Sequence, residues 1–232
     1  MQGKTVIVTG GFGILGSAVA EAAKAAGAQV AALDLAPEPR PELRQRLGDA
    51  VLYLGGVDLG SAEAAQAAMA AVKARFGRID VLVNVAGGFR WETVADGDAA
   101  TWDKLFAMNV KSALNASKAA LPELLASGAG RIVNIGANGA LKAAAGMGAY
   151  GASKAGVHRL TEALAEELKG SGVTVNAVLP SIIDTPVNRA DMPDADFGKW
   201  VKPAELARII LFLAAEASGA ITGALLPVTG GV

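Results

Sequence analysis

The stretch Thr9-Gly10-Gly11-Phe12-Gly13-Ile14-Leu15-Gly16 indicates the fold of this chain more clearly than any other. It follows the short apolar run Val6-Ile7-Val8 and precedes an alanine-rich segment of helical composition. In such a strand-to-helix turn, Gly10 would allow the sharp bend, Gly13 the close approach of a pyrophosphate, and Gly16 tight helix–strand packing. The helix N-terminus would offer free N–H groups to the phosphates. The G-x-x-G-x-x-G spacing alone also fits an ordinary turn, so its meaning depends on the rest of the chain.

Outward from this turn, short β-rich runs alternate with helix-length stretches along the whole chain. The predicted strands are Lys4–Thr9, Ala28–Asp34, Ala50–Gly55, Ile79–Val85, Arg131–Ile135, Val173–Leu179 and Ala224–Val228. The predicted helices are Ile14–Ala26, Ala62–Phe76, Thr101–Ser127, Met147–Lys169 and Pro203–Ala217. The strands have continuous apolar centres, which is typical of strands covered on both faces. The pattern predicts an α/β protein, a single domain over residues 1–232 with a doubly wound (Rossmann) parallel sheet of about seven strands flanked by helices.

Composition excludes several classes of protein. Hydrophobic residues make up 52% of the 232 residues and charged residues 19%, so the chain is not disordered. Lys and Arg number 21 against 22 Asp and Glu, a balance that gives no basic surface for nucleic acid. There is no Cys and a single His, His158, so we expect no disulfide, no thiolate chemistry and no metal site.

No apolar stretch has the length of a signal-peptide core or a membrane span. The run Thr5–Val8 is far too short, and Ile209–Ala215 is stopped by Glu216. We therefore expect a cytoplasmic protein whose partner is neither a membrane nor nucleic acid.

An acidic residue, Asp34, ends the second predicted strand. A carboxylate at this position can accept hydrogen bonds from the ribose hydroxyls of an adenosine, and it would repel a 2′-phosphate. No Arg immediately follows it. The register therefore predicts NAD rather than NADP as the cofactor, and it makes a merely solvated strand-end carboxylate the weaker interpretation.

Tyr150 and Lys154 lie four positions apart in a predicted helix, so both side chains share one face. The pKa of a free tyrosine is about 10. A neighbouring ammonium group would stabilise the phenolate and lower that pKa, which would suit the phenol for acid–base catalysis. Helices contain such pairs by chance, but this one opens the helix after the fifth strand, where it favours a catalytic role.

Taken together, these motifs resemble the short-chain dehydrogenase/reductase family along essentially the whole chain. Further matches are Asp58 after the third strand, Asn84-Val85-Ala86-Gly87 after the fourth, Asn109 in mid-helix, Pro180…Thr185, and Ile221-Thr222-Gly223…Gly230-Gly231. The resemblance implies that Tyr150 donates or accepts the proton and that Lys154 also binds the nicotinamide ribose. It further implies that Asn109 holds a water in the proton relay and that Thr185 reaches the carboxamide.

The same resemblance implies a full set of cofactor-binding residues and an assembly. The residues are Gly10, Phe12, Gly13, Ile14, Asp34, Leu35, Asp58, Leu59, Asn84, Ala86, Gly87, Tyr150, Lys154, Pro180, Ile183 and Thr185. The substrate would be a small molecule, and the protein would form a homodimer or homotetramer as family members habitually do.

One departure from the family pattern concerns catalysis. The family usually places a Ser 13 residues before the catalytic Tyr, where this chain has Ala137. Loss of one such preorganised donor costs about 3–4 kcal/mol of transition-state stabilisation in a well-studied oxyanion hole. Asn138 next to it is an unlikely substitute, because adjacent residues leaving a strand point in opposite directions.

A narrower resemblance to dihydropteridine reductases, an NADH-using branch of the family, accounts for this Ala. The branch also has the G-x-x-G-x-x-G turn and Ala in the Ser position. Matching stretches are Val85–Phe89, Gly146–His158, Leu179…Arg189 and Met192-Pro193-Asp194-Ala195-Asp196-Phe197…Trp200. The branch reduces a quinonoid dihydropterin, a conjugated heterocycle that accepts hydride at nitrogen and needs no Ser to polarise a ketone. The resemblance implies such a substrate here.

Four residues are predicted on the substrate side: Ala137, Phe89, Trp91 and Trp200. The three aromatic rings could stack on a flat heterocycle, although packing roles fit them equally well. The segment Asp184–Trp200 has neither helical nor strand periodicity and follows a strand end, so a substrate lid is expected there. Trp102 and Phe106 are predicted to lie in the core, and His158 is predicted to pack internally or at a subunit interface.

Two alternatives to this reductase remain open. One is a carbonyl or alcohol oxidoreductase that tolerates the loss of the Ser. The other is a non-catalytic NAD-binding sensor or partner protein. A pure binder has no need of Tyr150, Lys154 and Asn109 together, which argues against the second alternative.

Overall fold

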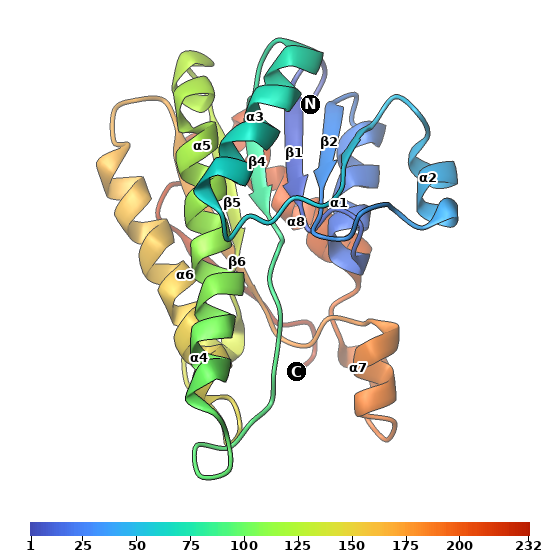
Figure 1. The fold of residues 1–232 in the computed structure, drawn as a ribbon, viewed down its shortest axis with the longest axis vertical. Coiled ribbons are helices and arrows are strands. Elements are labelled where there is room, and N and C mark those ends of the chain that lie inside the picture. Colours follow the sequence, from blue (N-terminus) through green and yellow to red (C-terminus); the bar gives the residue numbers. More distant parts are fainter.

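A parallel sheet forms the centre of the computed structural model, which describes residues 1–232 (Figure 1). Its seven strands are β1 Thr5–Thr9, β2 Gln29–Leu33, β3 Leu52–Leu54, β4 Val81–Asn84, β5 Arg131–Ile135, β6 Thr174–Pro180 and β7 Leu225–Val228. Their order across the sheet is β3-β2-β1-β4-β5-β6-β7. The winding direction reverses between β1 and β4, the position where open α/β sheets bind ligands. This topology confirms the predicted doubly wound fold.

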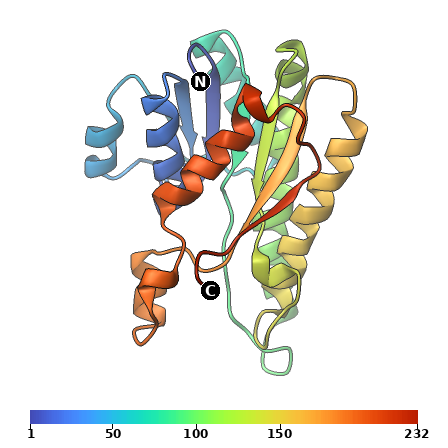
Figure 2. The ribbon, with the colours of Figure 1, turned by 180° about the vertical axis from the view of Figure 1, so that it is seen from behind.

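Helices cover both faces of the sheet. The α-helices are α1 Ile14–Ala25, α2 Pro41–Leu47, α3 Ala62–Phe76, α4 Ala99–Phe106, α5 Ser112–Ala126, α6 Gly148–Glu167, α7 Pro186–Asp191 and α8 Pro203–Ala214. Short helical turns are η1 Ala107–Lys111, η2 Asn138–Ala140, η3 Phe197–Lys199 and η4 Glu216–Ser218. Figure 2 shows α1 and α8 packed together on one face, while α3, α5 and α6 lie on the other. No helix has the length and apolar character needed to cross a membrane.

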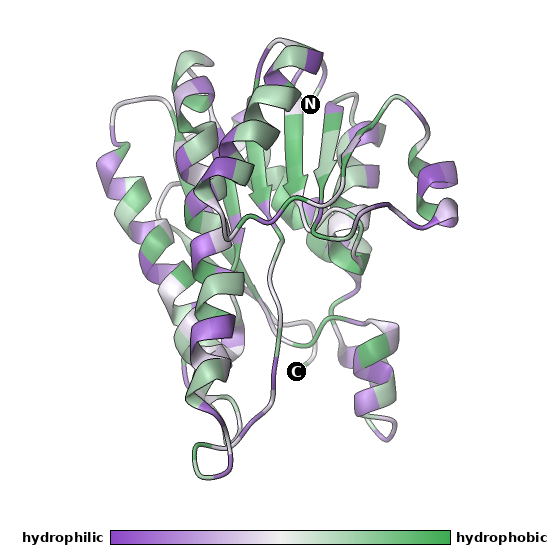
Figure 3. Ribbon diagram, in the orientation of Figure 1, coloured by the Kyte–Doolittle hydropathy of each residue, from purple (hydrophilic) through white to green (hydrophobic).

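The strands are apolar on both sides because each face has its own core (Figure 3). Val6 and Val8 of β1 belong to the cluster under α1 and α8, whereas Ile7 belongs to the cluster under α3 and α5. This alternation is the pleat of a strand buried on both faces. It explains why the predicted strands read as continuous apolar runs.

The predictions for the helical parts of the chain need four corrections. The Pro-rich stretch at 37–41 leads into α2, which was not predicted, although Pro41 is well suited to a first helical position. The predicted helix Thr101–Ser127 consists of α4, the π-helical turn η1 and α5. Trp102 and Phe106 are 43% and 50% exposed, so their predicted core position is wrong. The expected irregular segment Asp184–Trp200 contains α7 and η3.

Candidate active site

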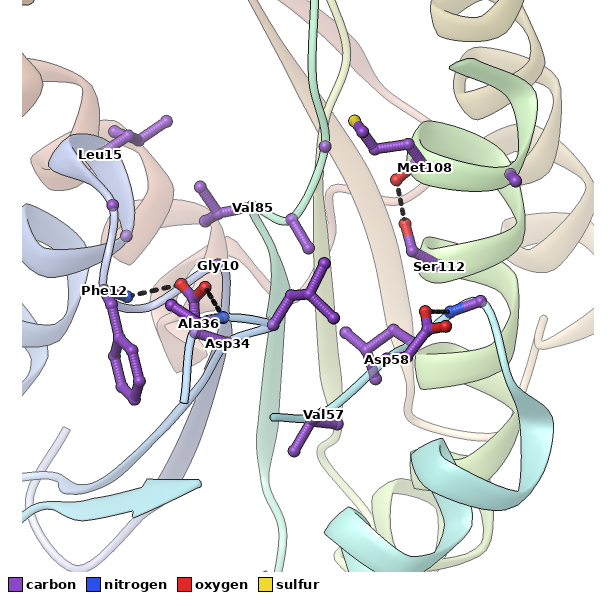
Figure 4. Close-up of a pocket in the computed structure, with 18 of the residues that line it drawn as sticks. Gly10, Phe12, Leu15, Asp34, Ala36, Val57, Asp58, Val85, Met108 and Ser112 are labelled. Carbon is purple, nitrogen blue, oxygen red and sulfur yellow. Dashed lines mark hydrogen bonds between the residues drawn. The ribbon is translucent and has the colours of Figure 1, made fainter. Parts of the chain in front are cut away.

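A cleft of about 880 Å³ lies at the carboxyl ends of β1, β2, β3 and β4 (Figure 4). The predicted cofactor-binding residues that line it are Gly10, Phe12, Gly13, Ile14, Asp34, Leu35, Asp58, Leu59, Ala86 and Gly87. The predicted set Tyr150, Lys154, Pro180, Ile183 and Thr185 lies outside this cleft, at the exits of β5 and β6. The predicted residues therefore form two groups, one at the nucleotide end of the site and one at the reactive end.

The glycine turn leaves no room for side chains. Gly10 has a φ of +62°, and an added Cβ would lie 3.0 Å from the backbone of Ala86. A Cβ at Gly16 would collide with the carbonyl of Gly10, so α1 packs directly on the turn. Gly13 is the N-cap of α1 and supplies no side-chain cap, which leaves the first N–H groups available to an anion. These features fit a dinucleotide pyrophosphate.

Asp34 braces this turn as well as facing the cleft. Its carboxylate accepts hydrogen bonds from the N–H groups of Phe12, at 2.9 Å, and Ala36, at 3.0 Å (Figure 4). A carboxylate has about four acceptor positions, so both oxygens can still accept from ribose hydroxyls. The ring of Phe12 packs against Tyr53, and Arg40 lines the same cleft near Asp34.

The residues of one wall of the cleft were not predicted from the sequence. This wall comes from α4, η1 and the start of α5 and contains Lys104, Ala107, Met108, Lys111 and Ser112. The hydroxyl of Ser112 donates to the carbonyl of Met108 at 2.6 Å (Figure 4). These residues lie within one or two helical turns of Asn109, a site residue predicted from the sequence, and this proximity could have indicated them.

Asn109 joins three elements of the site. It lies in the π-helical turn η1, is buried, and exchanges hydrogen bonds with Gly88: its Oδ1 accepts from the N–H at 2.9 Å, and its Nδ2 donates to the carbonyl at 3.1 Å. Nδ2 also donates to the hydroxyl of Ser153 on α6 at 2.9 Å. The side chain therefore positions the β4 exit against α6. Its water-holding role behind Lys154 stays a prediction.

Tyr150 and Lys154 occupy the first turns of α6. The Nζ of Lys154 is buried and donates to the carbonyl of Ile135 at 2.8 Å, and burial lowers the pKa of Lys154 to about 8. The ring of Phe89 meets Tyr150 edge-on, with centroids 4.9 Å apart. Burial raises the pKa of Tyr150 to about 12. The predicted lowering by Lys154 is therefore wrong here, because desolvation of the phenolate dominates. A raised pKa favours the neutral phenol, and the role of Tyr150 as proton donor stays a prediction.

Asn84 is not among the residues that line the cleft, and its contact with the cofactor stays a prediction. Its side chain is buried, and Nδ2 donates to the Ser117 hydroxyl at 3.0 Å and to the side-chain Oδ1 of Asn134 at 2.9 Å. Asn134 in turn donates to Thr161 on α6 at 2.8 Å. This buried chain of hydrogen bonds ties β4 and β5 to α5 and α6 beneath the site. Asn84 thus acts on the site through the sheet.

The substrate side is built from the loops that follow β4 and β5. Ala137 is 4% exposed, and its N–H donates to Nε2 of His158 at 3.3 Å. Phe89 is 56% exposed, and Trp91 fastens the two loops together by donating to the Ala145 carbonyl at 3.1 Å. Trp200 is 4% exposed and packs at a tilt against Phe197, so its predicted stacking on substrate is wrong.

The segment that was predicted to form a lid is held together at its base by contacts among its own residues and those beside it. Ile183 forms a β-bridge with Val201, and the Thr185 hydroxyl caps α7 by accepting from the N–H of Asn188 at 3.2 Å. Arg189 pairs with Asp184 through two hydrogen bonds, which lowers the pKa of that carboxyl. Contact of Thr185 with a carboxamide stays a prediction.

His158 is buried on α6 as an internal packing residue and should make the fold acid-sensitive. Burial, with the charges of Arg159 and Lys154, lowers its pKa from 6.5 to about 4. Between these values the unfolded state binds more protons, so stability falls as pH falls from 6.5 towards 4, by about 3 kcal/mol. Urea unfolding at several pH values measures this loss. His158→Gln, which keeps an acceptor without titrating, should flatten the curve. An identical pH dependence in both proteins would contradict this assignment.

Comparison with known proteins places the chain in a family. A family model described as short chain dehydrogenase matches residues 4–196. D-threitol dehydrogenase of Mycolicibacterium smegmatis is 36% identical over 242 residues, covering 100% of this chain and 93% of that protein. Galactitol 2-dehydrogenase (L-tagatose-forming) of Cereibacter sphaeroides is 35% identical, covering 100% and 95%. The crystal structure of carveol dehydrogenase from Mycobacterium avium in complex with NAD is similar with a TM-score of 0.88 and 27% identity, covering 100% and 98%.

The chain therefore belongs to the short-chain dehydrogenase/reductase family and is an oxidoreductase. This finding confirms the family resemblance and sets aside the alternative of a non-catalytic binding protein. The relatives named above are dehydrogenases, and none is a dihydropteridine reductase. The narrower resemblance is thus unsupported by them and enters below as a proposal.

Proposed function

We propose that this protein is an NADH-dependent reductase of a conjugated, electron-poor heterocycle of the quinonoid dihydropterin type. The observation that carries the proposal is Ala137, a buried methyl group at the position where the family usually has a hydroxyl donor. A site without this donor is poorly suited to an isolated ketone, whose developing oxyanion needs it. A heterocycle that accepts hydride at nitrogen spreads the developing charge over its ring, so it does not need this hydroxyl donor.

The aromatic surroundings support a flat substrate. Phe89 exposes more than half of its surface while its ring edge rests on Tyr150, and Trp91 is similarly exposed on the same loop. Exposed aromatic rings next to a catalytic phenol offer stacking surfaces for a planar ligand. A polyol would instead be expected to require several hydrogen-bonding side chains at this position.

The chemistry divides between the bound cofactor and the protein. When bound, the reduced nicotinamide supplies the hydride. The glycine turn, Asp34 and Lys154 hold the dinucleotide, and the neutral phenol of Tyr150 donates the proton that balances the hydride. Reprotonation of Tyr150 from water, past Lys154 and Asn109, would complete the cycle.

A second candidate is a dehydrogenase of secondary alcohols or polyols. It is favoured by the activities after which two relatives are named, D-threitol dehydrogenase and galactitol 2-dehydrogenase. One assay distinguishes the two candidate functions, because it follows the absorbance of NADH at a fixed enzyme concentration with each class of substrate. Rapid oxidation of NADH by quinonoid dihydropterin, with little NAD reduction by threitol or galactitol, is expected. The reverse pattern would establish the second candidate.

Asp34 should make NADH the preferred cofactor. Its carboxylate, held by the N–H groups of Phe12 and Ala36, would accept from the ribose hydroxyls and repel a 2′-phosphate. We expect kcat/KM to be at least about tenfold higher with NADH than with NADPH, and Asp34→Ala to narrow this ratio. Measuring kcat/KM with both cofactors tests this preference. Arg40→Gln is the control, because it removes a cation that lines the same cleft and leaves Asp34 unchanged. Equal use of NADPH by the unaltered protein would refute the role of Asp34.

We further propose a homodimer or homotetramer. Its basis is a set of exposed apolar side chains along α4 and α5: Trp102, Phe106, Leu114 and Leu125. Exposed apolar surface of this kind commonly marks an interface. Sedimentation equilibrium measures the assembly directly.

A further inference from the structure

Asn115 reaches from α5 to the loop between β3 and α3. Its Nδ2 donates two hydrogen bonds to successive backbone carbonyls, those of Leu59 at 2.9 Å and Gly60 at 3.0 Å. A primary amide has two N–H hydrogens, so both are used on this one loop. The residue belongs neither to the motifs described above nor to the lining of the cleft.

The loop that Asn115 holds forms one side of the nucleotide end of the cleft. Val57, Asp58, Leu59 and Gly60 all line it (Figure 4). Asp58 closes a tight turn within the loop, because its Oδ1 accepts from the N–H of Gly60 at 2.8 Å. The loop is thus bonded internally by Asp58, and Asn115 supplies its side-chain hydrogen bonds from α5.

The other supports of this loop come from its β2 side and from the core: the N–H of Val57 donates to the Asp34 carbonyl at 2.9 Å, and Leu59 is buried in the cluster under α3 and α5. The loop follows β3, the edge strand, which has three residues and pairs only with β2. Edge strands with few ladder bonds open at low energetic cost. The two bonds from Asn115 attach the loop to α5, which packs on the central strand β4.

This loop faces the adenosine side of the cleft. Leu35, directly after Asp34, lines the same cleft and is two-thirds exposed. Leu35 and this loop both line the nucleotide end of the cleft beside Asp34, where a slot for a flat base is expected next to the ribose. The reactive pair Tyr150 and Lys154 lies on α6, away from this slot.

We propose that Asn115 is a positioning residue that fixes the adenine side of the cleft and thereby sets the affinity for the dinucleotide. The proposal rests on the dinucleotide cofactor of the proposed function. Asn115 acts through the loop backbone and contributes nothing to hydride or proton transfer. Affinity and turnover should therefore respond separately to its replacement.

Asn115→Asp tests this directly, because it keeps the shape, removes both N–H donors and turns carboxylate oxygens toward two carbonyls. We expect the Kd for NADH to rise roughly ten- to hundredfold. The Kd for ADP-ribose, which lacks the nicotinamide, should rise by the same factor. At saturating NADH, kcat and the KM for the second substrate should stay within about twofold of the unaltered protein. Fluorescence titration and initial rates give the four quantities.

Matched variants separate positioning from general damage. Lys118→Gln changes an exposed side chain on the same helix and should leave both Kd values unchanged. If Asn115→Asp does not fold, Asn115→Ala removes the donors without adding charge and should weaken NADH binding in the same direction. An unchanged Kd in a folded Asn115 variant, an equal loss in Lys118→Gln, or a fall in kcat alone would overturn the proposal. Failure of the unaltered protein to bind NADH would instead overturn the proposed cofactor.

Discussion

Tyr150→Phe is expected to lower kcat by about 10²–10⁴-fold while the Kd for NADH changes little. The reason is the separation of the two ends of the site. The dinucleotide would be held by the glycine turn, Asp34 and Lys154, whereas the phenol acts on the reacting atom. Because burial raises the pKa of Tyr150 to about 12, the phenol is protonated throughout the working pH range and can act as the proton donor of a reductase.

Steady-state kinetics and NADH titration of the same preparation test this expectation. Tyr53→Phe provides a matched control, because Tyr53 is the other tyrosine of the chain and donates to the Gly48 carbonyl away from the reactive end. It should retain full turnover. A Tyr150→Phe protein with near-normal kcat would mean that the proton comes from another group. A large rise in the Kd for NADH would mean that the phenol mainly binds cofactor.

The fold was predictable because its signals are local. A strand buried on both faces must be apolar throughout, so β1, β4 and β5 are recognisable without any partner. The glycine turn is partly local, since Gly16 is required by the backbone of Gly10 and Gly11 a few residues away, whereas the contact that excludes a side chain at Gly10 comes from the distant Ala86. The helix α2 was missed because its flanking prolines resemble a loop, although Pro41 at a first helical position is a helix signal.

The site was predictable by residue type but less so by orientation. Asn84 is at the predicted strand end, yet its amide bonds Ser117 and Asn134 inside the fold. Trp200 is in the predicted segment, yet it packs at a tilt against Phe197 at the base of the lid. A motif specifies where a residue lies along the chain, whereas the direction of its side chain depends on distant neighbours.

The same limit applies to electrostatics. Spacing alone placed an ammonium group beside Tyr150 and predicted a lowered pKa. The balance between that charge and desolvation depends on how deeply the phenol is buried by distant parts of the chain; the ring of Phe89, for example, contacts it from a loop about 60 residues earlier in the sequence. Asn115 is a further case, because nothing in its local sequence indicates that its amide supports a loop after β3.

Ala137→Ser is expected to distinguish the two substrate classes. In a ketone reductase, the restored hydroxyl would donate to the developing oxyanion and should raise kcat/KM by about 10²–10³-fold, the effect of one oxyanion-hole donor. In a reductase of quinonoid dihydropterin, the hydride acceptor is a nitrogen within a conjugated ring, so the added donor has no oxyanion to stabilise. We therefore expect the unaltered protein to be fast on the pterin and the Ser variant to gain little there while gaining measurably on ketones.

The experiment measures NADH oxidation with quinonoid dihydropterin and with a panel of ketones for both proteins. Ala137→Gly serves as the matched control, because it changes the same position without adding a donor and should show no gain on either class. The N–H of Ala137 donates to His158, and neither substitution removes this backbone donor, so we expect the backbone that carries the new hydroxyl to stay in place. Fast ketone reduction by the unaltered protein, with none of the pterin, would refute the heterocycle proposal and leave the family membership intact. A gain on the pterin as large as that on ketones would mean that its reduction also passes through a localised oxyanion, and Ala137 would then no longer identify the substrate.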